Sequence, residues 1–310
     1  MQLAVPPECA GLRLDQCLAR LLPGHSRSRL QAWIRDGLVS VNGSRCQPKL
    51  TVWGGERIEL TPAPLPAEGA AAPEAIALAV VFEDDALLVI DKPAGLVVHP
   101  GSGNWRGTLL NALLHHAPPL TAIPRAGIVH RLDKDTSGLM VVAKTLEAQT
   151  SLARQLHARS VRREYLALVH GRVTRDGSVE APVGRHPVHR TRMAVVTRGR
   201  HALTHYRVLE RFPGCTLVRC RLETGRTHQI RVHMQSIGHP LVGDPTYGRR
   251  ASADNARVRT LLAQFPRQAL HAARLELEHP VSGGRMSWES PPPPDLSELI
   301  ESLRRFAERP

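Results

Sequence analysis

Residues 127–138, GIVHRLDKDTSG, concentrate charge between two apolar segments. The pattern predicts a loop that joins buried strands and carries two carboxylates, Asp133 and Asp135, with two cations, Arg131 and Lys134. Ionised groups that lose water near a buried strand cost several kcal/mol unless protein partners replace that water. This loop is therefore the first candidate for a site of chemistry.

Two other interpretations fit part of the loop. In a solvated turn, the Asp135 side chain would bind nearby backbone and Gly138 would supply a positive φ. Residues 133–138 also fit the first half of a calcium-binding EF-hand loop, with oxygen ligands at alternate positions and glycine at the sixth. The twelfth position of such a loop needs a bidentate glutamate, and here it is Lys144, which excludes calcium.

Residues 130–138, HRLDKDTSG, resemble the signature loop of the RluA family of RNA pseudouridine synthases. The resemblance implies that Asp133 is the catalytic residue. We expect Asp135 to hold the loop in place. Residues 91–100, DKPAGLVVHP, and 239–248, HPLVGDPTYG, continue the same resemblance.

Two further motifs follow in the order expected for the family. Residues 162–171, RREYLALVHG, predict a strand. A tyrosine in an apolar strand usually only packs in the core, but the resemblance implies that Tyr165 stacks on the target base. Residues 222–233, LETGRTHQIRVH, place Arg231 between two apolar residues. The resemblance implies that Arg231 pairs with the catalytic aspartate, and an adjacent cation does keep a carboxylate ionised and oriented.

The composition points to a soluble protein with a polyanionic partner. The 310 residues contain 41 Lys plus Arg and 28 Asp plus Glu, for a formal charge of +13, which favours nucleic acid through counterion release. No apolar run approaches the roughly 18 residues of a membrane span, and we find no secretory signal, so we expect a cytoplasmic location. Five cysteines without a CxxC pair indicate neither a disulfide framework nor a zinc cluster.

The first sixty residues predict a small unit of two helices and a hairpin. Apolar residues at helical spacing span residues 14–21, a second helix would start after a Ser26 cap, and Asn42-Gly43 predicts a tight hairpin turn. This unit resembles the S4 RNA-binding domain, most specifically in residues 37–43, GLVSVNG. The resemblance implies RNA as the ligand and makes Arg13, Arg27 and Arg29 candidate RNA contacts, although arginines on a helix are often only its solvated face.

The chain divides into three parts in this interpretation. Residues 1–61 form the S4-like domain, the Pro- and Ala-rich residues 62–76 form a linker, and residues 77–310 form the catalytic domain. The family resemblance implies an α+β fold for the last part, with a mixed, mainly antiparallel sheet. We also expect Asp295 and Glu298 to cap a final amphipathic helix.

Basic residues outside the motifs are candidates for binding RNA. Residues 185–201 predict a basic hairpin that would enter an RNA groove, although a solvated hairpin fits nearly as well. The candidate contacts in this region and near the loop are Arg131, Arg190, Arg192 and Arg226. His228 and His233 lack the glutamate of a metalloprotease HExxH pair, so we expect no metal.

The resemblance implies isomerisation of uridine to pseudouridine without a cofactor. Within the family, the chain is most similar to the branch that modifies the helix 69 stem-loop of 23S ribosomal RNA, so the expected partner is that RNA or a large-subunit ribosomal particle. We expect a monomer that does not bind membranes. Two alternatives are a ribosome-assembly factor that has lost activity and a hydrolytic nucleosidase that releases free uracil; the presence of Asp133, Tyr165 and Arg231 disfavours the first.

Overall fold

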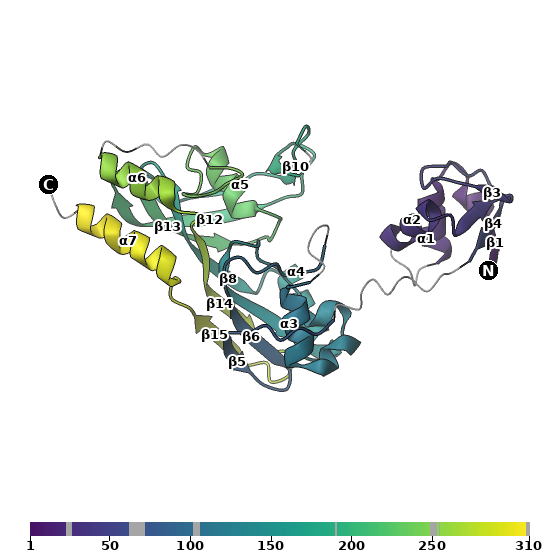
Figure 1. Cartoon of the computed structure of the whole chain (residues 1–310), viewed down its shortest axis with the longest axis horizontal. Coiled ribbons are helices and arrows are strands. Elements are labelled where there is room, and N and C mark those ends of the chain that lie inside the picture. The colour runs from purple at the N-terminus through teal and green to yellow at the C-terminus, as the bar shows by residue number, and fades with distance from the viewer. Residues whose placement is uncertain are drawn as a thin grey trace. The chain divides into compact units, whose positions relative to one another are not determined.

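The computed structural model of the chain describes residues 1–22, 27–61, 72–101, 106–189, 191–248, 253 and 255–307. The chain folds into two compact units, residues 1–70 and 71–310 (Figure 1). Residues 62–71, which make up most of the predicted linker, lie outside the described residues. None of the described helices is long and apolar enough to cross a membrane.

The first unit packs two helices against a four-stranded antiparallel sheet of order β1-β4-β2-β3. Its core contains Leu14, Leu18, Trp33 and Ile34, at the helical spacing that the sequence predicts. The described Asn42 and Gly43 both have positive φ, as a two-residue hairpin turn between β2 and β3 requires. The elements are β1 (Gln2–Ala4), η1 (Pro7–Cys9), α1 (Leu14–Leu21), α2 (Arg27–Arg35), β2 (Val39–Val41), β3 (Ser44–Arg45) and β4 (Arg57–Leu60).

The second unit is built on a nine-stranded sheet of order β5-β6-β7-β14-β8-β13-β12-β9, with β15 paired to β14. Among its described pairings, only that of β7 with β14 is parallel. The predicted α+β class with a mainly antiparallel sheet is therefore confirmed. The strands of this sheet are β5 (Val80–Glu83), β6 (Leu87–Lys92), β7 (Ser137–Ala143), β8 (Arg162–His170), β9 (Gly177–Glu180), β12 (Leu203–Phe212), β13 (Cys215–Leu222), β14 (Leu270–Glu278) and β15 (Arg285–Glu289).

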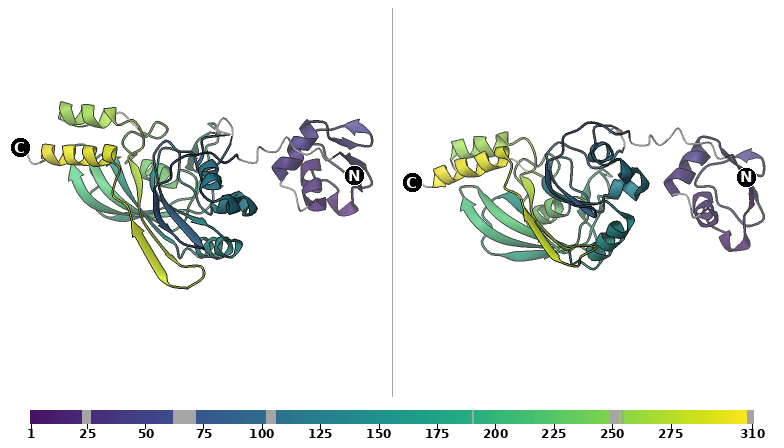
Figure 2. Two further views of the ribbon diagram at one scale, coloured as in Figure 1. Left: turned by 60° about the horizontal axis from the view of Figure 1, so that its bottom comes forward. Right: turned by 90° about the horizontal axis from the view of Figure 1, so that it is seen from below.

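Both faces of this sheet are covered. In β6, Leu88 and Ile90 join a core cluster with residues of α3 and α5, whereas Leu87 and Val89 join a second cluster with residues of α4 on the other face. Helices α6 and α7 lie side by side over a third cluster (Figures 1 and 2). The helices are α3 (Leu109–His116), η2 (Pro118–Ala122), η3 (Pro124–Gly127), α4 (Leu146–His157), α5 (Gln229–Ser236), α6 (Ala256–Gln264) and α7 (Pro294–Ala307).

Local details differ from the sequence prediction at two places. The predicted basic hairpin forms a separate two-stranded sheet of β10 (Val183–Arg185) and β11 (Met193–Val195), and its Arg190 lies outside the described residues. Asp295 lies inside the first turn of α7, and its carboxylate accepts hydrogen bonds from Arg267. The prediction that Asp295 caps α7 together with Glu298 is wrong in position, because the helix already begins at Pro294, although the Asp295 carboxylate also accepts from the backbone N–H of Leu296 over 2.8 Å.

Candidate functional site

The charged loop of residues 128–136 runs between η3 and β7. Arg125 and Ala126 have left-handed backbone angles, and Gly127 follows with φ 74°. A Cβ at Gly127 would lie 1.9 Å from the carbonyl oxygen of Ala143, so only glycine fits this close approach of η3 to β7. All seven residues of β7 are buried. The loop therefore starts and ends on tightly fixed backbone.

Arg231 on α5 pairs with Asp133 on this loop. Arg231 Nη1 donates to Asp133 Oδ2 over 3.0 Å, and 16% of the Asp133 side chain is exposed. The Arg231 side chain is only 5% exposed. A charge-assisted hydrogen bond of this kind is short and directional, so it fixes the orientation of the carboxylate. The structure thus brings together the two residues that the sequence analysis paired.

Asp244 is the second carboxylate partner of Arg231. It accepts from Nε and Nη2 over 2.7 and 2.8 Å, and its side chain is fully buried. Burial alone would raise the pKa of Asp244, but Arg231 and the backbone N–H groups of Thr246 and Tyr247 hold it below the usual value. Burial would likewise lower the pKa of Arg231, and Asp244 and Asp133 together raise it. The arginine is therefore a permanent cation held between two carboxylates.

His228 and Tyr247 complete the surroundings of Asp133. His228 Nε2 lies 3.8 Å from Asp133 Oδ1, and His228 Nδ1 lies 2.8 Å from the Tyr247 hydroxyl. The guanidinium of Arg231 lies over the Tyr247 ring, 5.0 Å from its centroid. The segment that follows α5 thus supplies two partners of Arg231: the Asp244 carboxylate as its counter-charge and the Tyr247 ring beside its guanidinium.

Lys92, the last residue of β6, hydrogen-bonds the backbone of this loop. Its side chain is fully buried, and Nζ donates to the carbonyl oxygens of Pro93, Leu96 and Lys134 over 2.7 to 3.0 Å. Burial lowers the pKa of Lys92 to about 8, against the opposing effect of Asp135 and Asp133. A buried ammonium with three carbonyl acceptors ties the loop to the β6 end.

Two residues just before β14, Arg267 and Gln268, also hydrogen-bond this loop. Arg267 pairs with Asp295 of α7 over 2.7 and 2.9 Å, and its Nη1 donates to the carbonyl oxygen of Asp135 over 3.1 Å. The next residue, Gln268, donates to Thr136 Oγ1 over 3.2 Å. The predicted loop-holding role of Asp135 therefore involves its backbone carbonyl in the structure.

Tyr165 lies on β8 in the largest core cluster, together with Leu132 and Ile230. These two residues directly precede Asp133 and Arg231 in sequence, so the tyrosine shares a core cluster with the neighbours of the ion pair. Its exposed fraction is 5%, and burial raises its pKa, with a smaller contribution from the charge of Asp133. Tyr165 therefore lies close enough to Asp133 to respond to its charge. That Tyr165 stacks on a base stays a prediction.

The predicted RNA-binding arginines are in different situations. Arg131 beside the ion pair and Arg192 in the β10–β11 hairpin are exposed. Arg226 is half-buried and donates to the carbonyl oxygen of His201 over 3.1 Å. In the first unit, Arg13 pairs with the buried Asp15 at 3.1 Å. Arg27 and Arg29 belong to α2, but their side chains, like all of Arg190, lie outside the described residues.

Sequence reasoning missed the supporting residues Asp244, Lys92, Arg267 and Tyr247. Two of them had a local signal: Lys92 ends a run of apolar strand residues, and Asp244 follows the apolar residues 241–242. A charge next to a buried strand indicates a specific partner. Within the described part of the chain, no group of three His, Cys, Asp or Glu residues could hold a metal ion.

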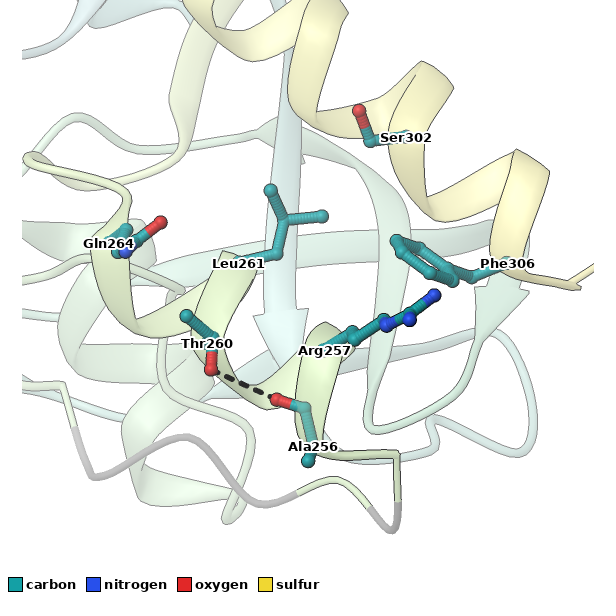
Figure 3. A pocket seen from close by; sticks show the side chains of 7 residues that line it. All are labelled: Ala256, Arg257, Thr260, Leu261, Gln264, Ser302 and Phe306. Atoms are coloured by element: carbon teal, nitrogen blue, oxygen red, sulfur yellow. Dashed lines mark hydrogen bonds between the residues drawn. The ribbon is translucent and has the colours of Figure 1, made fainter.

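A groove of about 420 Å³ lies between α6 and α7, away from the ion pair (Figure 3). Thr260 and Leu261 of α6 and Phe306 of α7 line it, and the Thr260 hydroxyl donates to the carbonyl oxygen of Ala256 over 3.0 Å. Its lining includes none of the residues around Asp133. The groove is therefore a feature separate from the Asp133–Arg231 pair.

Comparisons with known proteins match both units. Residues 86–236 match the family described as RNA pseudouridylate synthase, and residues 12–58 match the S4 domain. Ribosomal large subunit pseudouridine synthase D of Nitrosomonas europaea is 60% identical over 99% of this chain and 88% of its own. The protein of the same name from Pseudomonas aeruginosa is 57% identical over 98% of this chain and 96% of its own.

A solved structure is also similar. Human RNA pseudouridylate synthase domain containing 1 is 27% identical, covers 74% of this chain and 96% of its own, and superposes with a TM-score of 0.57. This human protein matches about three quarters of the chain, whereas the two bacterial relatives match nearly all of it.

We predict that Asp244→Asn destabilises the second unit by about 3 kcal/mol at pH 7, because it removes the closest counter-charge of a buried arginine. The control is Glu210→Gln, which removes an exposed partner of Arg304 and should cost at most about 1 kcal/mol. Urea denaturation of the whole chain measures both.

The pH dependence gives a second check on this ion pair. The pKa of Asp244 is lower in the folded protein, so its stabilisation is fully present above the ordinary aspartate pKa and is lost as pH falls through the folded value. The difference between wild type and Asp244→Asn should therefore shrink below about pH 4. Equal stability of the Asp244→Asn and Glu210→Gln proteins at pH 7 would contradict the assigned role.

Proposed function

The chain belongs to the RNA pseudouridylate synthase family, and on that premise we propose that it converts uridines of the helix 69 stem-loop in 23S ribosomal RNA to pseudouridine. Support for a ribosomal substrate comes from the relatives, whose name assigns them to the large ribosomal subunit. The S4 domain and the charge of +13 agree with an RNA ligand.

One observation carries the chemical part of the proposal: the Asp133 carboxylate is paired with Arg231 over 3.0 Å and is still partly open to solvent. In the isomerisation, the N1–C1′ bond breaks, the uracil turns, and C5 bonds to C1′; C5 then loses its proton and N1 gains one. The first step develops positive charge on the ribose, which a carboxylate stabilises or traps. Asp133 can attack C1′ or remove the C2′ proton, and both routes need the ionised form.

The surroundings of Asp133 bear on the choice between isomerisation and hydrolysis. Glycosidases that hydrolyse a glycosidic bond usually pair the reacting carboxylate with a carboxylic acid that protonates the leaving group. Asp244, the carboxylate that shares Arg231, is fully buried and held ionised by two guanidinium hydrogen bonds, so it cannot donate a proton. Asp244 therefore does not serve as that acid, and release of free uracil, measured beside pseudouridine, distinguishes a nucleosidase from an isomerase.

The substrate uridine must leave its stack to reach this carboxylate. Flipping a base costs a few kcal/mol, and less in a loop, which fits a stem-loop substrate. In the proposal, Tyr165 stacks on the flipped base, and Arg131 and Arg192 with the other candidate arginines bind phosphates. The enzyme acts in the cytoplasm as a monomer, on free 23S ribosomal RNA or a large-subunit particle, without a cofactor.

Asp133→Asn is the decisive test. We expect it to abolish pseudouridine formation, because asparagine cannot stabilise a cation at C1′, form an ester with it or take a proton from C2′. RNA affinity should stay within about tenfold, or about 1.4 kcal/mol, because phosphate contacts lie elsewhere. Release of tritium from C5 of a transcribed stem-loop measures turnover, and a titration at fixed salt measures affinity.

Asp135→Asn is the matched control for this test. Arg267 binds the Asp135 carbonyl, which the substitution keeps, so turnover should persist. Turnover by a folded Asp133→Asn enzyme would overturn the site assignment. An active Asp133→Asn protein beside an inactive Asp135→Asn protein would transfer the role to Asp135.

The role of Tyr165 can be tested by comparing its Phe and Leu variants. Phe keeps the aromatic face and should preserve most of the turnover, whereas Leu keeps an apolar core residue without that face and should lose about 1–3 kcal/mol of transition-state stabilisation. Single-turnover rates, with thermal unfolding as a check on packing, measure the difference. Equal losses in both variants would assign the role to the hydroxyl.

Removal of residues 1–61 should weaken RNA binding and flatten its dependence on salt, because arginine–phosphate contacts of the S4 domain are lost. Each lost contact lowers the slope of log affinity against log salt by about 0.7 to 0.9. Binding titrations at several salt concentrations measure the slope. If both slope and affinity match those of the whole chain, residues 1–61 do not bind the RNA.

A further inference from the structure

The two oxygens of the Asp133 carboxylate have different neighbours. Oδ2 accepts from Arg231 over 3.0 Å, and Oδ1 lies 3.8 Å from His228 Nε2. Among the described residues, none hydrogen-bonds Oδ1, so we assign the reaction with the ribose to this more open oxygen. His228 is therefore the protein group beside the reacting oxygen.

We propose that His228 is a positioning residue for Asp133, held by Tyr247 as the neutral tautomer that carries its proton on Nε2. This inference rests on the proposed function, since it assigns a role in the same reaction. It concerns how the carboxylate is kept in one orientation, and which imidazole form does so.

The hydrogen bonds of the Tyr247 hydroxyl determine the tautomer. The backbone N–H of Met193 donates to this oxygen over 2.8 Å, and His228 Nδ1 lies 2.8 Å away. Tyr247 is 4% exposed, so its own proton needs an acceptor inside the protein. Met193 supplies a donor, which leaves Nδ1 as the acceptor. The ring proton must then be on Nε2, facing Asp133.

The charges around the ring favour its neutral form. Burial lowers the pKa of His228, and the guanidinium groups of Arg231 and Arg131 lower it further, while Asp133 and Asp244 raise it; the net shift is downward. An imidazolium would also need an acceptor for a second N–H at Nδ1, where the Tyr247 oxygen already accepts from Met193. At neutral pH, the carboxylate therefore faces one cation, Arg231, and one neutral donor.

The backbone fixes the ring in this place. His228 precedes α5 with left-handed angles, φ 55° and ψ 23°, which cost energy for a residue other than glycine or asparagine. The Tyr247 ring meets the imidazole edge to face, with centroids 5.6 Å apart. A strained residue held by packing and a buried hydrogen bond cannot turn away easily, so Nε2 stays aimed at Oδ1.

A neutral donor at this distance has a specific use. Although 3.8 Å is longer than a hydrogen bond, closure of this N–H on Oδ1 in the substrate complex would limit rotation of the carboxylate about the bond to its Cβ, so that Oδ1 keeps one direction toward the ribose. It does so without a second positive charge, which would make the carboxylate a weaker nucleophile or base. Once substrate fills the space beside Oδ1, the N–H can also shorten its contact with the carboxylate.

The tautomer can be observed directly in the whole chain. Long-range proton–nitrogen NMR spectra of ¹⁵N-labelled protein at pH 7.5 distinguish the two neutral forms and the cation, and loss of one set of signals in His228→Gln assigns the residue. We expect the Nε2–H form in wild type and a loss of this single form in Tyr247→Phe. An Nδ1–H or doubly protonated ring in wild type would overturn the proposal.

Kinetics test the positioning role. Gln can reach with its amide N–H to the place of Nε2, whereas Asn tolerates the left-handed backbone but is too short, so His228→Asn controls for backbone strain. We expect single-turnover rates to fall about 10- to 100-fold in His228→Asn, as for loss of a hydrogen bond to a charged group, and by less than about threefold in His228→Gln. RNA affinity should stay within about threefold in both.

The outcomes separate this inference from the proposed function. A wild-type enzyme that forms no pseudouridine on the stem-loop would overturn the proposed function, while the NMR spectra would still report the tautomer. Wild-type rates in His228→Asn, or a loss confined to RNA affinity, would overturn the positioning role of His228 with the proposed function intact.

Discussion

The buried guanidinium of Arg231 is the interaction on which the rest of the site depends. A buried cation without partners would cost several kcal/mol, and Asp244 removes that cost by taking two of its hydrogen bonds inside the protein. Because Asp244 neutralises the arginine, Asp133 receives a third N–H of the guanidinium without having to be buried itself. One carboxylate makes the burial of Arg231 possible, and the other remains available to a substrate.

The loop that carries Asp133 is held by cations that bind its backbone. Lys92 donates to the Lys134 carbonyl and Arg267 donates to the Asp135 carbonyl. Neither cation forms its hydrogen bonds with the Asp133 carboxylate, so they fix the loop and leave that carboxylate to Arg231. The Arg267 contact also links the loop to the first turn of α7 through Asp295.

Sequence reasoning reached the local features of this chain and missed most of its long-range pairs. The helical spacing of α1, the Asn42-Gly43 turn and the HRLDKDTSG loop are short-range signals, because neighbouring residues alone produce them. The partners of the loop lie far along the chain: 42 residues separate Lys92 from Lys134, and 132 separate Arg267 from Asp135. Only the family resemblance linked Asp133 with Arg231, because the spacing of residues along the sequence does not show which charged side chains pair in the folded protein.

The same interaction explains why the exposed Arg131 can lie close in sequence to the Asp133 carboxylate without pairing with it. Arg131 and Asp133 are separated by Leu132, which is buried in the core, so the loop turns its arginine and its aspartate away from a common apolar anchor. If Asp133 lacked a fixed partner, attraction would draw it toward Arg131 and neutralise both groups. Because Arg231 already holds the carboxylate, the loop can carry an exposed arginine and a partly exposed aspartate two residues apart while each keeps its own surroundings.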